Sequence, residues 1–461
     1  MYRPQDFYKN LTIPQFTILT GLIVILVGTF FIDLPICSSA KVGLWEAFFT
    51  ATSAITVTGL TVIDIGNDLT FFGQLVLALM ILAGGLGLMA ITTFLQGFII
   101  KGTELRTRID KGKTLDEYGV GAVGRTFKRI LFTALIIIAC GALVLFFFGF
   151  DENQDIRSRI WISLFHSISA YNNAGFALWS ESFQGYRTNL VVNIVITFLI
   201  ILGGVGWRVT NDLWINRTHF KFKTLRLHTR IVLRTSFYLI IFGTIGLLLT
   251  ESLLGGKFFV GMNILERIVA AFFESVSSRT AGFTNYPISI NTVSDSGLLL
   301  LMTLMFIGAS PGGTGGGIKT TTFAALMAAT RSTLRGQKDV VIRNRLISDK
   351  VILRALGITV GSLLFVLSMA MFISISHSFV EERSFTFLEM LFTCISAFAT
   401  VGFDVGVTNQ LTHFGQLILI IGMFVGRLGI LLLLSAVWQA MRQERLHLQN
   451  RVGYPKADLY V

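Results

Sequence analysis

Four glycines recur along the chain at intervals of roughly 110 residues, which indicates a duplicated structural unit. They are Gly59, Gly175, Gly282 and Gly402, and each is followed by one large apolar residue. A serine precedes the glycine by six residues in three copies and by five in the third. Glycine allows the positive φ angle or close approach that a carbonyl-lined turn needs. Four such turns around one axis would let main-chain oxygens replace the water around a monovalent cation.

The residues that end each turn are therefore candidates for a cation-selective filter. One copy of the motif is more typical of a glycine that caps a buried helix, but four matching copies favour the filter. The negative ends of the preceding helices would further favour a cation. The candidate filter residues are Val57, Thr58, Gly59, Asn173, Ala174, Gly175, Thr280, Ala281, Gly282, Thr400, Val401 and Gly402.

A second glycine-rich segment lies in the middle of a long apolar run of the third repeat. Proline removes a helical hydrogen bond and glycine weakens a helix, so we expect this run to break into two helices joined by a loop. A loop below the filter would gate a pore; a static kink is the alternative. A phosphate-binding loop is excluded because Ile318 separates the glycines from the lysine. The candidate gate residues here are Ser310, Pro311, Gly312, Gly313, Thr314, Gly315, Gly316, Gly317 and Lys319.

Charged side chains inside apolar runs usually face a cavity and mark a pathway. Lys319 and Arg427 are two such residues. We expect Arg427 to approach the loop from across the pore, where its charge would hinder cations or hold loop carbonyls. A structural ion pair or snorkelling to the surface is the alternative. Arg279, which precedes the third turn, is expected to brace that filter strand.

The composition indicates an integral membrane protein. Of 461 residues, 53% are hydrophobic and only 14% are charged, whereas soluble domains carry about 25% charged residues. The net charge of +12 comes from lysines and arginines that gather near the chain ends and in three linkers, at 101–129, 208–234 and 331–354. Basic loops stay cytoplasmic, so this charge predicts topology and not nucleic-acid binding. We expect a multi-pass plasma-membrane protein with both termini in the cytoplasm.

Each repeat consists of a long apolar run, a short run that ends at the glycine turn, and a second long run. The first long runs are at about 15–34, 130–150, 231–254 and 351–376. The short runs are at 44–56, 160–171, 266–278 and 385–397. The second long runs are at 71–100, 188–210, 296–330 and 412–440. A helix of a dozen residues is about 18 Å long and cannot cross a hydrocarbon core of roughly 30 Å, so we expect the short runs to be re-entrant.

The predicted fold is an all-α integral membrane protein built from four tandem helix–pore-helix–helix repeats. Eight transmembrane helices and four re-entrant pore helices would surround a pseudo-fourfold central pore. The predicted units are repeats at 1–100, 101–210, 211–330 and 331–440, followed by a cytosolic tail at 441–461. No catalytic serine elbow, paired cysteines or histidines at metal-ligand spacing occur in the sequence, so we do not expect an enzyme.

At these motifs the chain resembles the Trk/Ktr/HKT superfamily of potassium transporters, and most of all the Ktr-type membrane subunit of bacteria. The resemblance covers nearly the whole chain. It is carried by the four glycine turns, by the third-repeat segment from Ser310 to Thr320 and by Gly426-Arg427-Leu428-Gly429. It implies one pore per chain, one essential glycine per repeat, an intramembrane gate loop in the third repeat and a role for Arg427.

The resemblance also implies partners and a transported ion. Members of this kind are homodimers, work with a KtrA-like cytosolic ring of nucleotide-binding regulatory subunits, and in several cases are stimulated by Na+. We expect K+ as the transported ion, Na+ as a possible activator, and the nucleotide on the partner subunit. Gly59 favours K+, because relatives with serine at that position tend to favour sodium.

Two other functions stay open at this point. One is the same architecture passing Na+. The other is a secondary transporter with broken helices and a midplane site, which usually shows paired repeats and often an intramembrane carboxylate.

Overall fold

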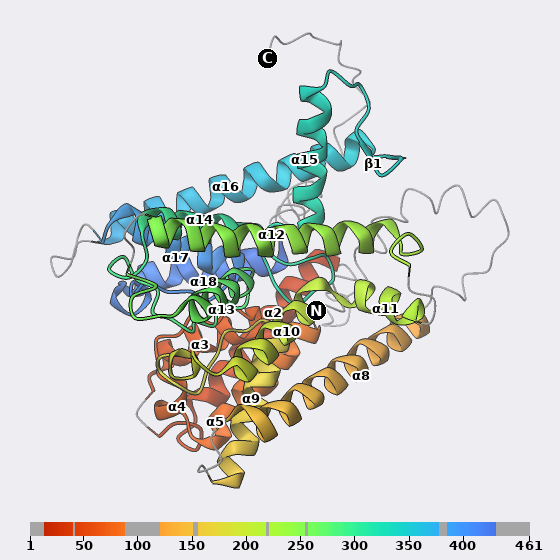
Figure 1. The fold of residues 1–461 in the computed structure, drawn as a ribbon. Coiled ribbons are helices and arrows are strands. Elements are labelled where there is room, and N and C mark those ends of the chain that lie inside the picture. The colour runs from red at the N-terminus through yellow and green to blue at the C-terminus, as the bar shows by residue number, and fades with distance from the viewer. Residues whose placement is uncertain are drawn as a thin grey trace, which may run out of the picture.

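The computed structural model describes residues 13–39, 42–87, 120–150, 155–217, 221–253, 257–377 and 385–429. Helices dominate this part of the chain and pack side by side around short central helices (Figure 1). The predicted tail at 441–461, much of the linker at 101–129 and the ends of two predicted runs lie outside the described residues. The predicted repeat boundaries remain a prediction.

The first two repeats follow the expected order of elements. The first contains α2 (Ile13–Asp33), α3 (Leu44–Thr56), α4 (Ile65–Asp68), α5 (Phe71–Leu82) and the π-helical turn η1 (Ala83–Gly87). The second contains α8 (Val120–Val144), η4 (Leu145–Gly149), α9 (Ile156–Asn172), η5 (Gln184–Tyr186), α10 (Leu190–Val205) and α11 (Trp207–Ile215). Helix α9 begins four residues earlier than the predicted run and has 17 residues.

The last two repeats add a small hairpin between them. The third contains α12 (Leu227–Leu253), α13 (Ile264–Ser277), α14 (Asp295–Phe306) and α15 (Thr320–Leu334). The hairpin pairs β1 (Val341–Ile342) with β2 (Arg345–Leu346) in antiparallel register. The fourth contains α16 (Asp349–His377), α17 (Phe387–Ala399), η7 (Thr408–Gln410) and α18 (His413–Leu428). The hairpin turn places Arg343 and Asn344 at positive φ, as a tight two-residue turn requires.

The short helices α3, α9, α13 and α17 form the inner layer, and their last turns are buried. Two of them begin with a reciprocal capping box, Asn263 with Glu266 and Thr386 with Glu389, which fixes where the helix starts. The long helices α8, α12 and α16 lie outside and expose large apolar side chains such as Phe132. Such an exposed apolar girdle is what a lipid-facing surface requires.

Three described helices are long and apolar enough to cross a membrane: Phe127–Gly149, Leu227–Leu253 and Asp349–His377. A fourth span results if α10 and α11 count as one. Five shorter apolar helices occupy positions predicted for four further spans and one pore helix, and two of these, α5 with η1 and α18, end beside residues that are not described.

The predicted break in the third repeat is confirmed, because residues 307–319 separate α14 from α15. We call this segment the repeat-three loop. The second repeat differs from the prediction of one run at 188–210. Helix α10 ends at Val205 and α11 leaves at 96°. Gly206 makes the bend with φ 86° and ψ 151°, a conformation essentially confined to glycine.

Candidate ion-binding site

Each short helix ends in an unusual backbone turn. Val57, Asn173 and Thr400 cap α3, α9 and α17 in the left-handed conformation, at φ of 57°, 58° and 52°. In the third repeat α13 ends at Ser278 in the right-handed conformation, and Thr280 takes the positive φ, at 79°, two residues before the motif glycine as in the other three copies. Branched residues rarely adopt positive φ, so the surrounding structure must hold these turns. Such strain is typical of functional sites.

The four motif glycines form a closed ring. A side-chain carbon built on Gly59 would lie 3.0 Å from the Cα of Gly175, and one on Gly175 would lie 3.2 Å from the Cα of Gly282. One on Gly282 would lie 3.1 Å from the Cα of Gly402, and one on Gly402 would lie 3.1 Å from the Cα of Gly59. Each would come still closer to the carbonyl oxygen before the neighbouring glycine. The ring therefore has no room for side chains.

In three of the four motifs the serine fixes the turn from behind. In the first and fourth repeats the hydroxyls of Ser53 and Ser396 accept the glycine N–H, at 3.0 and 3.1 Å. In the shorter third copy Ser277 instead donates to the carbonyl of Phe283, at 2.5 Å. The buried hydroxyl of Ser169 has no partner among the described residues. The six-residue spacing thus places a hydroxyl under the glycine amide.

A second tie behind the ring involves His166 and Glu274, neither of which the sequence analysis selected. Each lies three residues before its motif serine, and each accepts the N–H of the residue three after the glycine. Leu178 donates to Nε2 of His166 at 3.2 Å, and Asn285 donates to Oε1 of Glu274 at 3.0 Å. Their shared position within the motif was the signal that could have identified them.

The repeat-three loop lies against the ring from one side. Its Ser310 and Thr314 amides donate to the carbonyls of Gly204 and Gly203, at 3.0 and 3.2 Å. A side-chain carbon on Gly315 would collide with the hydroxyl of Thr280, and one on Gly316 with that of Thr400. Thr280 and Thr400 begin two of the candidate filter strands. The glycines therefore let the loop approach these strands closely.

The other predicted loop residues lie in the same place. Ser310, Pro311, Gly312, Thr314, Gly315 and Gly316 are buried, and Gly313 and Gly317 are partly buried. Gly312 and Gly317 have positive φ, at 79° and 64°. The carbonyl of Gly312 accepts the N–H of Trp207 at 3.2 Å, so the loop touches the bend that follows α10.

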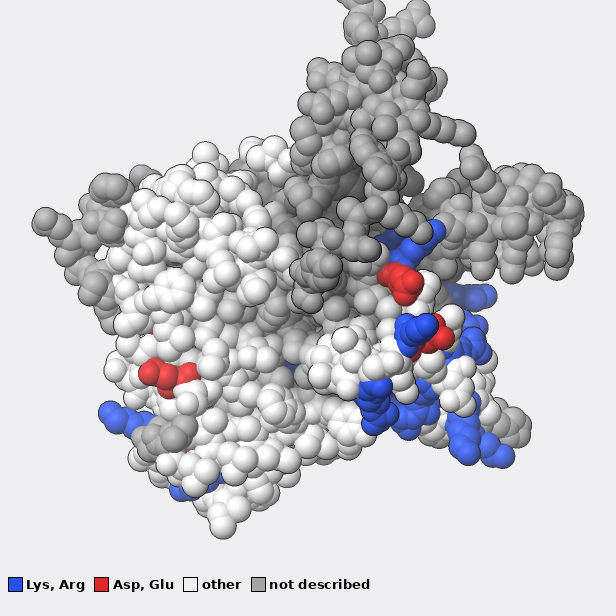
Figure 2. Space-filling model, turned by 90° about the horizontal axis from the view of Figure 1, so that it is seen from above, with Lys and Arg blue, Asp and Glu red and all other residues white. Residues whose placement is uncertain are grey.

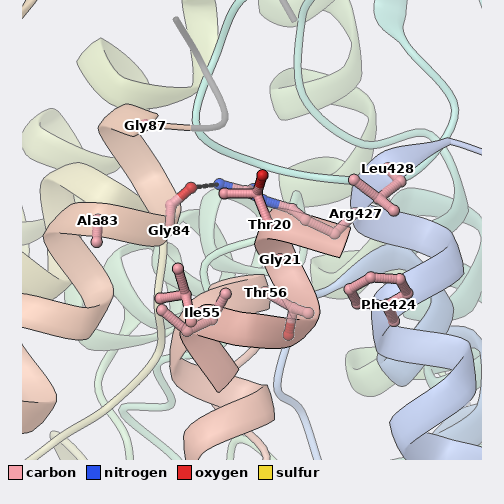
Figure 3. A pocket seen from close by; sticks show the side chains of 11 residues that line it. Thr20, Gly21, Ile55, Thr56, Ala83, Gly84, Gly87, Phe424, Arg427 and Leu428 are labelled. Carbon is pink, nitrogen blue, oxygen red and sulfur yellow. Dashed lines mark hydrogen bonds between the residues drawn. The ribbon is translucent and has the colours of Figure 1, made fainter. Parts of the chain in front are cut away.

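Two basic side chains hold carbonyls of the loop. Lys319 Nζ donates to the carbonyls of Gly315 and Gly316, at 2.8 and 3.3 Å. Arg427, only 8% exposed, donates through Nη1 to the carbonyl of Thr314 and through Nη2 to that of Gly84, at 2.9 Å (Figure 3). Arg427 thus links α18 to the loop and to η1. An apolar cavity of about 170 Å³ lies beside it, between α2, η1 and α18.

Arg279 differs in detail from the prediction that it braces the third filter strand. Its guanidinium donates to the carbonyl of Gly308 at 3.2 Å and lies 3.4 Å from the carbonyl and hydroxyl of Ser236. The side chain leaves the strand and joins it to α12 and to the start of the loop.

The site is thus a ring of four main-chain turns, reached from one side by a loop that buried basic groups hold, within a helical protein whose outer surface is apolar. Comparison with known proteins agrees. The model of the TrkH family, described as cation transport protein, matches residues 10–447, and this chain belongs to that family.

Two curated relatives are both called Ktr system potassium uptake protein B. The one from Bacillus subtilis is 34% identical over 98% of this chain and 97% of its own length. The one from Vibrio alginolyticus is 36% identical over 90% of this chain and 89% of its own length. The potassium/sodium uptake protein NtpJ of Enterococcus hirae is 33% identical over 95% of both chains.

The fold is similar to a crystal structure of the potassium transporter TrkH from Vibrio parahaemolyticus. The two share a TM-score of 0.72 and 18% sequence identity, over 91% of this chain and 83% of the other. With the family and the apolar outer helices, this makes the chain a multi-pass, mainly helical membrane protein of a transporter family.

Proposed function

We propose that the protein is the ion-translocating subunit of a potassium uptake system. The observation that carries the proposal is the closed ring of Gly59, Gly175, Gly282 and Gly402. Three close relatives in sequence carry potassium uptake in their names. A ring of turns from four repeats supplies main-chain oxygens from all sides, which is the arrangement that replaces the hydration shell of K+.

In this proposal the three residues that end each turn form the selectivity filter. The residue before each glycine is Thr58, Ala174, Ala281 or Val401, and its carbonyl oxygen lies beside the neighbouring glycine. The four short helices end at the ring, so their partial negative charges favour a cation there. Because the chemistry is ion exchange between water and carbonyls, the protein needs no covalent step and is not an enzyme.

The repeat-three loop is the gate in this proposal. It lies against Thr280 and Thr400, where an ion leaving the filter would pass. The positive charges of Lys319 and Arg427 lie at carbonyls of this loop, where they repel a cation that enters the path. Opening requires that these hydrogen bonds and those to Gly203 and Gly204 break or move together.

Sodium is the alternative ion, since one relative is named for potassium and sodium uptake. The two are separated by flux of rubidium-86 into proteoliposomes that hold the purified protein, with K+ or Na+ as competitor. We expect K+ to suppress rubidium entry at far lower concentration than Na+. If Na+ suppresses rubidium entry as well as K+ does, the protein does not select K+, and the sodium alternative replaces our proposal.

We place the protein in the plasma membrane, with both termini in the cytoplasm and α11 on the cytoplasmic side. The names of two relatives describe one part of a Ktr system. We propose that this chain likewise forms a homodimer that binds a KtrA-like regulatory ring, with the nucleotide on that ring and Na+ as an activator. Co-purification of the dimer with such a ring, and release on nucleotide exchange, is the measurement that tests this.

A further inference from the structure

Helix α11 does not continue the direction of the apolar helix before it. It turns by 96° at Gly206 and runs for nine residues, Trp207–Ile215 (Figure 1). If α10 crosses much of the bilayer, a helix bent through about a right angle at its end lies along the membrane surface. Helices in that position are amphipathic, with one face toward the headgroups and acyl chains.

The two faces of α11 have different surroundings. On the inner face Val209 and Asp212 are buried, and Asp212 accepts hydrogen bonds from Thr229 Oγ1 at 2.6 Å and Arg226 N at 3.0 Å. These bonds fasten α11 to the start of α12. On the outer face Trp214 is 68% exposed and Ile215 is 60% exposed. An exposed tryptophan at the end of an apolar span is typical of the membrane–water interface.

A basic side chain lies against this exposed apolar pair, and two more follow it in the chain. The guanidinium carbon of Arg217 lies 4.0 Å from the centre of the Trp214 ring, and Lys221 and Lys223, four and six residues further along the chain, are exposed. Figure 2 shows lysine and arginine gathered on one side of the molecule, with a few acidic side chains among them, and little charge on the described surface of the opposite side. The nearby carboxylate of Asp212 is occupied by its internal hydrogen bonds. We call Trp214, Ile215, Arg217, Lys221 and Lys223 the α11 surface.

Helix α11, which carries this surface, is joined directly to the repeat-three loop at its first residue. Trp207, the first residue of α11, donates its N–H to the carbonyl of Gly312. The two glycines that end α10, Gly203 and Gly204, accept from Thr314 and Ser310 of the same loop. A change in the position of α11 therefore acts on one hydrogen bond to the loop directly, and the two bonds from α10 lie within four residues of it.

We propose that the α11 surface binds the anionic headgroups of membrane phospholipids, and that this binding adjusts the position of the repeat-three loop. The apolar pair fits the acyl boundary and the three basic groups fit phosphate, so the lipid supplies both kinds of contact at once. The lipid contact stands on the α11 geometry alone, whereas its effect on transport rests on the proposed function.

Lipid contact is tested with a fluorophore on Ile215→Cys, in a background whose Cys37, Cys140 and Cys394 are replaced by alanine. The protein is reconstituted in phosphatidylcholine that contains spin-labelled phosphatidylglycerol or spin-labelled phosphatidylcholine at equal fraction. We expect stronger quenching by the anionic lipid. The ratio of quenching by the anionic lipid to quenching by phosphatidylcholine reports how strongly anionic lipid is enriched at this site. This enrichment should fall by at least about fivefold in Arg217→Gln/Lys221→Gln/Lys223→Gln, since each basic group near an anionic surface contributes about that factor.

A matched control removes the same charge elsewhere. Arg157→Gln/Arg187→Gln/Lys257→Gln neutralises three exposed basic residues that lie at the start of α9 and beyond the ends of α10 and α12 that are remote from α11. This variant should keep the preference for anionic lipid. Equal quenching by both lipids in the wild type, or loss of preference in the control as well, would overturn the proposal in favour of general charge attraction or a protein partner.

Rubidium flux then tests the effect on the loop. We expect wild-type flux to differ severalfold between pure phosphatidylcholine and a mixture with phosphatidylglycerol, and the α11 triple variant to lose this difference. Preferential quenching with lipid-independent flux would overturn the link to the loop. Free inorganic phosphate that reproduces the effect in neutral liposomes would overturn lipid as its source. Absence of rubidium flux in every lipid would instead count against the proposed function and leave the quenching result standing.

Discussion

At the scale of single residues, the ring glycines combine two requirements that only glycine meets. Gly59 has φ 93°, and its missing side chain makes room for the backbone of the next repeat. A larger residue must therefore both strain its own backbone and displace the neighbouring strand. The two effects can be separated, because the chain also has positive-φ glycines in open space.

We predict that Gly59→Ser lowers the preference for K+ over Na+ by roughly tenfold or more, since displaced carbonyls no longer match the ion and about 1.4 kcal/mol suffices for that change. Ion competition against rubidium flux measures it. Gly406→Ser is the control, because Gly406 has φ 91° with nothing within 4 Å. Unchanged selectivity in a folded Gly59→Ser protein, repeated for Gly175→Ser and Gly282→Ser, would rule out the filter assignment.

Arg427 provides the second prediction at this scale. Its two hydrogen bonds join the loop to η1, and a hydrogen bond to a charged group contributes about 1.5–3 kcal/mol. Arg427→Gln should raise basal rubidium flux by about tenfold, because the closed position of the loop loses that contribution. Arg427→Lys keeps the positive charge but cannot donate to the carbonyls of Thr314 and Gly84 at the same time through two guanidinium nitrogens. If Gln and Lys both leave basal flux at the wild-type level, Arg427 does not hold the gate.

At the scale of elements, the repeat-three loop is held by three helices from two other repeats. It contacts Gly203 and Gly204 from α10, Tyr171 at the end of α9, and Arg427 from α18. A loop held by so many separate elements is a suitable point for control, because a shift in any of them alters its position.

Removal of Ser310–Gly316 should therefore give a leakier transporter. The shortened connection cannot reach the carbonyls of Gly203 and Gly204, so the path below the ring stays open. Rubidium uptake without a regulatory subunit measures this, and we expect a severalfold increase. Size-exclusion behaviour and ring selectivity serve as controls for folding. Flux that stays as low as in the wild type would show that the segment is only a kink.

The bend at Gly206 gives a separate prediction. Gly206→Ala combines backbone strain with a side-chain carbon 2.8 Å from the carbonyl carbon of Gly312. Gly429, which ends α18 at φ 87° and ψ 131°, shares the backbone conformation but has no described neighbour within 4 Å. We expect both alanine variants to lose stability by about 1–3 kcal/mol, and Gly206→Ala alone to change basal flux. Thermal unfolding in detergent and rubidium flux measure the two effects, and equal flux changes in both variants would contradict a specific role.

At the scale of the whole molecule, the repeated pattern allowed much to be predicted. Four turns at Gly59, Gly175, Gly282 and Gly402 were expected to meet, and Pro311 with its glycines was expected to break one span. The bend after Val205 was not expected, because the glycines of Gly203-Gly-Val-Gly206 are equally typical of close helix packing. Only the contact between Gly206 and Gly312 shows that the chain turns there. His166 and Glu274 were missed because the repeats were compared at their serines and glycines, and the shared position three residues before the serine holds different residue types.

The ring itself makes a prediction at this scale. If the four turns coordinate a dehydrated cation, a density map of the protein with rubidium should show an ion on the axis between Gly59, Gly175, Gly282 and Gly402. A structure in sodium alone is the comparison. Rubidium density elsewhere, with none inside the ring, would exclude this path.

One polypeptide supplies all four quadrants of the ring, yet the loop comes from only one of them. Four identical subunits around the same axis would bring four copies of that loop to a space that admits one. Because the four repeats belong to one chain, their sequences can differ. The third repeat carries the loop, the fourth carries Arg427, which hydrogen bonds to it, and the second carries the bend at Gly206 that it contacts. A single chain with four repeats can therefore place one loop below a nearly symmetric ring, whereas a homotetramer cannot.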